Sequence, residues 1–215
     1  MKDSVSAVYE FHHQHHREPG FTIMEKERSQ IFAEVIGTGK KIIDIGCRDG
    51  ALTKSFLTGN TVIGLDIDTN ALEQARQLGV DARYADLNGD WQQTMPVDFD
   101  VAVAGEVLEH LYYPDQVLKK ITSVLKPKGV LIGTIPNAFN LKNRLRYLKG
   151  SKRFTPLSDP THINHFTAAE LEGLMKMHFN EVEIRGLGRH AALAKWNPGW
   201  FAFDLLFIGR NPKKN

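Results

Sequence analysis

The sequence predicts a doubly wound α/β fold, in which a parallel sheet carries helices on both faces. Short apolar runs rich in Ile and Val alternate with segments of helical character along most of the chain. Acidic residues or glycines follow several of these runs, so they would gather at the carboxyl edge of the sheet, where such folds bind ligands. The 215 residues, 42% of them hydrophobic, suit one compact domain with a full core.

Two helices are expected before the first strand. They cover Ser4 to about Glu18 and Thr22 to about Ile36, and Pro19-Gly20 separates them. We assign residues 1–36 to an N-terminal helical cap and residues 37–215 to the main domain. The first helix carries four histidines within residues 12–16. Neighbouring positions of a helix point in different directions, so exposed histidines with incidental metal affinity are a better interpretation than a metal site.

The expected elements of the main domain follow one another with short connections. A turn at residues 196–200 should join the last two strands as a hairpin. Helices are expected at residues 51–57, 69–78, 114–125, 140–150 and 167–178. Strands are expected at residues 41–45, 61–66, 80–86, 98–104, 130–135, 181–186 and 201–208.

The turn after the first strand indicates which ligand binds there. Asp44 ends the strand and is followed by Gly46 and Gly50, so the spacing differs from the G-x-G-x-x-G of dinucleotide sites. A carboxylate at this point would repel a pyrophosphate, whereas it would attract an ammonium or a sulfonium. Asp66, twenty residues after Gly46, is placed to bind ribose hydroxyls. These features favour S-adenosylmethionine over NAD, although an NAD-dependent dehydrogenase stays an alternative.

Four segments in this order and spacing extend the pattern: IIDIGCRDG, GLDID, YADLN and FDVAVAGEVLEHL. They resemble the successive motifs of class I S-adenosylmethionine-dependent methyltransferases, from about Lys40 to Ile135. The sequence is most similar in character to the small-molecule branch, with its ubiquinone-biosynthesis O-methyltransferases and its sugar or polysaccharide-cluster methyltransferases. The resemblance implies a Rossmann-like sheet of seven strands, mostly parallel, with the last strand antiparallel.

The resemblance also implies a set of cofactor contacts. It places Asp86 near the adenine amino group and Leu87 beside the ring. Arg48 stands where the family usually has a small residue, so we expect its side chain to point away from the cofactor. The full set of expected cofactor residues is Asp44, Gly46, Cys47, Arg48, Gly50, Asp66, Ile67, Asp86, Leu87, Ala104, Gly105 and Glu106.

Catalysis of methyl transfer requires alignment of donor and acceptor, and a base where the acceptor is a hydroxyl or an amine. His110 and His162 are the candidate bases, with Glu109 as a further catalytic candidate. The segment Glu106-x-x-Glu109-His110 could also hold a divalent metal, as some of the similar ubiquinone O-methyltransferases do. We do not expect a metal, because helix capping and packing explain these residues as well.

The region from Pro136 to Phe166 is expected to form a substrate lid, because inserts after the fifth strand have this role in the family. Within it, residues 140–153 place leucines on one side of a helix and lysines and arginines on another. Such a stretch could contact a membrane surface, although an ordinary helix with a solvated face is the simpler interpretation.

Composition narrows the remaining choices. The formal net charge of +2 does not argue for nucleic acid, and Cys47 is the only cysteine, which excludes a disulfide framework. With no apolar signal or spanning segment, a cytoplasmic protein is expected.

We predict methyl transfer to oxygen, in preference to nitrogen, of a small-molecule acceptor. The alternatives are an RNA methyltransferase and a catalytically silent protein that binds the cofactor and regulates a partner. Neither the acceptor nor the oligomeric state has a readable code in the sequence.

Overall fold

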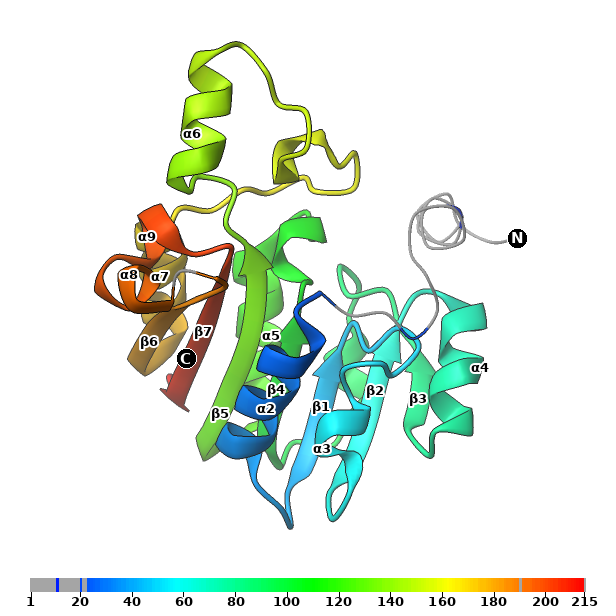
Figure 1. The fold of residues 1–215 in the computed structure, drawn as a ribbon. Coiled ribbons are helices and arrows are strands. Elements are labelled where there is room, and N and C mark those ends of the chain that lie inside the picture. The colour runs from blue at the N-terminus through cyan, green and yellow to red at the C-terminus, as the bar shows by residue number, and fades with distance from the viewer. Residues whose placement is uncertain (1–10, 12–19, 21–22, 190, 215) are drawn as a thin grey trace.

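The computed structural model describes residues 11, 20, 23–189 and 191–214. The predicted first helix, with its four histidines, lies outside the described residues except for Phe11. From residue 23 onward, strands and helices alternate as the sequence predicts (Figure 1).

A seven-stranded sheet in the order β3-β2-β1-β4-β5-β7-β6 forms the centre of the molecule. The five strands from β3 to β5 pair in parallel, and β7 pairs antiparallel with both β5 and β6. The predicted doubly wound, Rossmann-like sheet with an antiparallel last strand is therefore confirmed. The strands are β1 (Lys41–Ile45), β2 (Thr61–Asp66), β3 (Asp81–Tyr84), β4 (Phe99–Gly105), β5 (Leu125–Pro136), β6 (Phe179–Leu187) and β7 (Asp204–Pro212).

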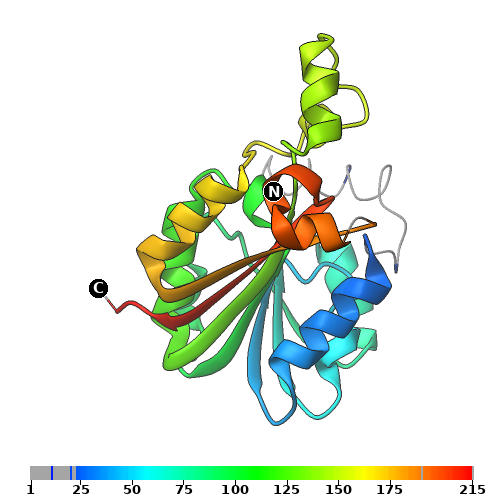
Figure 2. The same cartoon turned by 60° about the vertical axis from the view of Figure 1, so that its left-hand side comes forward.

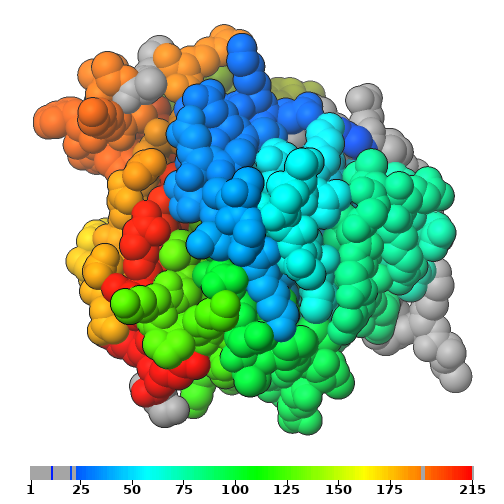
Figure 3. All heavy atoms as spheres, turned by 90° about the horizontal axis from the view of Figure 1, so that it is seen from below, coloured from blue at the N-terminus to red at the C-terminus, as the bar shows by residue number. Residues whose placement is uncertain are grey.

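Alternate residues of each strand bury their side chains on opposite faces of the sheet, which gives two hydrophobic cores. On one face, Ile42, Val103 and Leu206 belong to the core covered by α2 (Glu25–Ile36), α3 (Lys54–Leu57) and α4 (Thr69–Gln77). These three helices form one continuous layer, seen in blue, cyan and blue-green in Figure 3. On the other face, the second core is covered by α5 (Pro114–Val124) and α7 (Ala168–His178).

The helices begin where the sequence supplies capping groups. The Asp68 side chain accepts hydrogen bonds from the backbone N–H groups of Asn70 and Ala71 at the start of α4. Thr167 and Glu170 form a reciprocal capping box at the start of α7. Among the described helices, none is long and apolar enough to cross a bilayer.

Several element boundaries differ from the predicted ones. Helix α2 begins at Glu25. Strand β5 begins at Leu125, directly after α5, because Leu125 already pairs with Phe99 of β4. Strand β7 begins at Asp204, since Pro198–Phe201 forms a short helix, α9, instead of a simple turn. The other elements are α6 (Leu141–Leu148), α8 (Ala191–Trp196) and the 3-10 turns Trp91–Thr94, Leu108–His110 and Pro156–Ser158. Helix α6 stands away from the sheet, above its carboxyl edge (Figures 1 and 2).

Candidate active site

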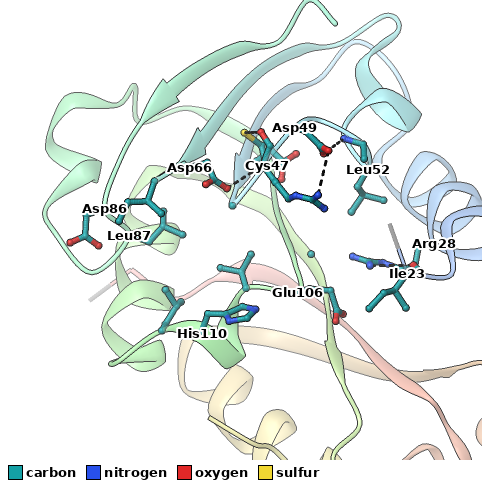
Figure 4. Close-up of a pocket in the computed structure, with 18 of the residues that line it drawn as sticks. Ile23, Arg28, Cys47, Asp49, Leu52, Asp66, Asp86, Leu87, Glu106 and His110 are labelled. Carbon is teal, nitrogen blue, oxygen red and sulfur yellow. Dashed lines mark hydrogen bonds and ion pairs between the residues drawn. The ribbon is translucent and has the colours of Figure 1, made fainter. Parts of the chain in front are cut away.

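A cavity lies at the carboxyl ends of β1, β2 and β4, and it holds about 1090 Å³ of empty space, part of it open to solvent. Figure 4 shows Asp86 and Leu87 at one end, Arg28 and Ile23 at the other, and Asp66 between them. The lining residues are Ile23, Arg28, Asp44, Gly46, Cys47, Arg48, Asp49, Ala51, Leu52, Asp66, Ile67, Asp86, Leu87, Asn88, Gly105, Glu106, Val107, His110 and Leu111.

Two glycines keep the floor of the cavity open. Gly46 has φ +75°, and a Cβ atom on it would lie 2.5 Å from Cγ2 of Val107. A Cβ atom on Gly105 would lie 2.7 Å from both Nη2 of Arg28 and Cδ2 of Leu52. Distances this short exclude a side chain at either position without displacement of a neighbour. At both glycines the backbone therefore lies directly against side chains of the cavity wall.

Asp44 lies at the tip of β1 with 3% of its surface exposed. The Thr53 hydroxyl donates a hydrogen bond of 2.6 Å to its carboxylate. Burial raises the pKa of Asp44 to about 7, because desolvation disfavours the charged form and outweighs that hydrogen bond. Asp66 adds to this rise, and the positive charge of Arg28 opposes it. A cationic ligand beside Asp44 would relieve the cost of its buried charge.

Asp66 is held at the end of β2 by backbone groups. Its two carboxylate oxygens accept hydrogen bonds of 2.9 Å from the N–H groups of Arg48 and Asp68. Arg48 has φ +48°, and its guanidinium lies 3.7 Å from the Asp49 carboxylate, which also lines the cavity. The structure thus places Arg48 in the cavity wall, whereas the sequence predicts that its side chain points away.

Two of the predicted cofactor residues do not line the cavity. Gly50, with φ +78°, closes the turn, and a Cβ atom on it would lie 3.1 Å from Leu78 at the end of α4. Ala104 is fully buried in the core on the α5 side of the sheet, since the strand alternation turns it away from Gly105. The remaining ten predicted residues all line the cavity.

Cys47 combines a place in the cavity wall with a packing role. Its thiol is buried, and a Cβ atom on Gly64 would lie 2.6 Å from its sulfur. Burial and the nearby carboxylates of Asp44 and Asp66 raise the pKa of the thiol well above its usual value. Cys47 is therefore a space-filling residue and not a reactive thiolate.

The three catalytic candidates meet at one side of the cavity. Glu109, His110 and His162 place possible metal-ligating atoms within 4.8 Å of one another. The rings of His110 and His162 lie edge to face, with centroids 4.8 Å apart, and His165 lies behind His162. Of these side chains, only His110 lines the cavity, because Glu109 is 2% exposed and points into the protein.

The orientation of the His110 ring follows from one hydrogen bond. Nδ1 of His110 lies 2.9 Å from the carbonyl oxygen of Thr161, which can only accept. Nδ1 therefore carries the proton, and in the neutral ring Nε2 holds the lone pair. Nε2 lies 3.8 Å from a Glu109 oxygen.

Glu106 does not join this cluster, although the sequence suggests a Glu-x-x-Glu-His group. Its backbone has φ +61°, and a 3-10 turn at Leu108–His110 follows it. Its side chain points to the end of the cavity where Arg28 lies (Figure 4). Arg28, on α2, is only 2% exposed. The sequence does not predict it as a site residue, because an arginine in an amphipathic helix is usually an ordinary surface residue.

Comparison with known proteins agrees with this geometry. The family model described as "Methyltransferase domain" matches residues 13–178. The chain belongs to the class I S-adenosylmethionine-dependent methyltransferases. A ubiquinone biosynthesis O-methyltransferase of Paraburkholderia phymatum is 30% identical over 148 residues, which cover 65% of this chain and 63% of that protein. The chain spans between 44% and 63% of the length of the first curated relatives that it matches.

Solved methyltransferase structures share the fold at low sequence identity. A methyltransferase of Thermotoga maritima, described as a possible histamine N-methyltransferase, superposes with a TM-score of 0.66 at 18% identity and covers 95% of each chain. The 1,6-didemethyltoxoflavin-N1-methyltransferase of Burkholderia thailandensis, solved with S-adenosylhomocysteine, gives 0.67 at 18% identity and covers 97% of this chain and 88% of its own. The alternative of an NAD-dependent dehydrogenase thus has no support from the comparisons.

Proposed function

We propose that this methyltransferase transfers a methyl group from S-adenosylmethionine to a hydroxyl oxygen of a small molecule. The observation that carries the proposal is the His110 imidazole in the cavity wall, with its proton on Nδ1 and its lone pair on Nε2. The O-methyltransferase names of the relatives at 30–36% identity support oxygen as the acceptor atom. Bound S-adenosylmethionine supplies an electrophilic methyl group.

The cavity residues fit this donor from end to end. Asp86 and Leu87 would bind the adenine, Asp66 the ribose hydroxyls, and the backbone at Gly46 and Gly105 the methionine chain. The buried Asp44 carboxylate would stabilise the nearby positive charge. The guanidinium of Arg28, at the end of the cavity opposite to Asp86, would bind the donor's carboxylate.

His110 would remove the acceptor's proton, with Glu109 stabilising the imidazolium that forms. His162 packs against the His110 ring and would hold its orientation. The Ser158–Phe166 loop is anchored beneath this cluster, since Ile163 and Asn164 both donate backbone hydrogen bonds to the Glu109 carbonyl. We assign residues 136–166 as the substrate lid and residues 1–36 as the N-terminal cap of the same site.

Helix α6 in the lid supports an additional proposal, contact with an anionic membrane surface. Leu145 and Leu148 are 51% and 84% exposed, and Phe154 is 73% exposed after the helix. The same segment carries Lys142 and Lys149 with exposed side chains. An apolar stripe flanked by lysines is the composition that binds the surface of an anionic bilayer.

The base assignment is tested by replacing each histidine in the intact chain. His110→Ala should lower kcat by about 10²- to 10⁴-fold, the usual contribution of a general base. His162→Ala should give a smaller loss, and both variants should bind S-adenosylhomocysteine with unchanged affinity. Unchanged turnover of a phenolic acceptor in both variants would refute the assignment. Turnover that stops with a chelator and returns with a divalent metal would instead support a metal-binding role for Glu109, His110 and His162.

A further inference from the structure

Behind the cavity, several buried oxygens have no hydrogen-bond partner among the described residues. They are both carboxylate oxygens of Asp204, Oε1 of Glu106 and the hydroxyl of Thr134. Asp204 is 1% exposed and Thr134 is fully buried. Buried polar groups in native proteins are nearly always hydrogen-bonded, because an unpaired one loses its interactions with water. Of these three residues Glu106 lines the cavity, so a ligand that brings a hydrogen-bond donor to its carboxylate would gain a favourable contact.

The strand register brings these three side chains together. Thr134 pairs with Gly105 of β4 and with Leu206 of β7, and the Glu106 N–H donates a 2.9 Å hydrogen bond to the Thr134 carbonyl. Asp204 lies two residues before Leu206, so both side chains leave β7 on the same face. That face is the one covered by α2, because Leu206 shares a core with Phe32.

The cluster adjoins the end of the cavity where Arg28 lies. Glu106 itself lines the cavity. The guanidinium of Arg28 lies against Gly105, because a Cβ atom on that glycine would be 2.7 Å from Nη2 of Arg28. Burial and the nearby Glu106 raise the pKa of Asp204 well above its usual range, while Arg28 opposes this rise. Two acids and one guanidinium thus share a site from which water is largely excluded.

We propose that Glu106 binds the α-ammonium group of the methyl donor by direct contact, with Asp204 as a positioning residue behind it. The proposal rests on the proposed function, since it names a further part of the donor site. Carboxylates accept hydrogen bonds, and an ammonium supplies three donors with a compensating charge. Arg28 lies beside them, and the amino-acid end of the donor carries a carboxylate and an ammonium side by side.

Three ligands separate the contributions of this end of the donor. S-adenosylhomocysteine has the ammonium and the carboxylate, its decarboxylated form S-adenosyl-3-thiopropylamine has only the ammonium, and methylthioadenosine has neither. Calorimetry on the full chain should show that Asp204→Asn and Glu106→Gln weaken binding of the first two by about tenfold. Binding of methylthioadenosine should stay within about twofold of wild type. Arg28→Gln should weaken only S-adenosylhomocysteine.

Asp98→Asn is the matched control, because this exposed acid lies at the start of β4, at the opposite edge of the sheet. It should leave all three affinities unchanged. Equal losses for all three ligands in the Asp204 and Glu106 variants would show a purely structural role and overturn the proposal. Unchanged affinities of both variants for all three ligands would overturn it too, even if the KM of an amine acceptor rises.

Thermal unfolding without ligand shows whether each variant is folded. Asp204→Asn should be at least as stable as wild type, because it removes a buried acid with no hydrogen-bond partner among the described residues. If that variant does not fold, Glu106→Gln carries the same test with an unchanged side-chain volume. Failure of the wild-type chain to bind S-adenosylhomocysteine at all would refute the proposed function itself, which is a distinguishable result.

Discussion

At the scale of single residues, the site depends on charges that are kept out of water. Asp44, Arg28 and Asp204 are each no more than 3% exposed. Burying an ionised group is costly unless a partner of opposite charge or a hydrogen bond compensates it. The charges of these residues therefore favour ligand binding at the expense of the stability of the ligand-free protein. Replacing Asp44 or Asp204 with a neutral residue should weaken binding without lowering that stability.

Asp44→Asn is expected to lower affinity for S-adenosylmethionine by at least about tenfold and to leave the ligand-free protein equally or more stable. The amide can still accept the Thr53 hydrogen bond, while it loses the charge that attracts the cation. Calorimetry and thermal unfolding measure the two effects. A variant that binds the donor like wild type would contradict the role given to Asp44.

The stability of the ligand-free protein should depend on pH through Asp44. Its pKa rises from 3.8 to about 7 on folding, so the protonated form is the one favoured in the folded state. The resulting stabilisation is fully present below about pH 4 and is lost as the pH rises through about 7. The difference in Tm between Asp44→Asn and wild type should therefore grow from about pH 4 to about pH 7 and level off above that; a constant difference would argue against the raised pKa.

At the scale of elements, α6 is the part least explained by packing. Leu141, Leu145 and Leu148 follow one another at helical spacing, and all three are exposed. The helix is held by the Asn140 cap and by hydrogen bonds at its base, where the Tyr147 hydroxyl donates to the Ala138 carbonyl at 2.8 Å. An apolar face without a covering element among the described residues is a candidate contact surface.

Charge reversal in α6 should reduce binding to vesicles that contain phosphatidylglycerol. The double variant Lys142→Glu/Lys149→Glu is expected to lose about tenfold or more in partitioning, since each surface lysine contributes about 1 kcal/mol. Lys119→Glu, on α5, makes the same kind of change on a different helix and should have little effect. Sedimentation with phosphatidylcholine vesicles as a second control should show weak binding for all. Equal binding of wild type and the double variant would exclude this role.

At the scale of the whole molecule, the cavity is shared by elements from most of the chain. It joins α2, the ends of β1, β2 and β4, and the segment that follows β3. A ligand in the cavity therefore contacts several parts that separate on unfolding, and its binding should stabilise the folded state as a whole.

S-adenosylhomocysteine at about 100 times its Kd should raise the Tm of the full chain by about 5–10 °C. This follows from a linkage free energy of about 2.7 kcal/mol and from the usual sensitivity of a domain of this size. Thermal scans at several ligand concentrations measure the shift, and NAD at the same concentrations serves as the control. A shift with NAD and none with S-adenosylhomocysteine would reverse the assignment of the cofactor.

Local patterns in the sequence are enough to predict the strand-and-helix alternation, the glycine turn after β1 and the acids at the tips of β1 and β2. In such patterns, residues a few positions apart set the backbone and the ligand chemistry together. Ten of the twelve cofactor residues named from such patterns line the cavity.

The packing of the whole chain determines which residues from distant parts of the sequence join these cofactor residues in the site. Arg28 reaches Gly105 because α2 packs across β4, and His162 meets His110 through the lid loop although the two are far apart in the sequence. Asp204 faces Glu106 because β7 inserts between β5 and β6, and no local pattern encodes that strand order. Side-chain neighbours across a sheet depend on register and topology, and these depend on interactions between segments far apart in the chain.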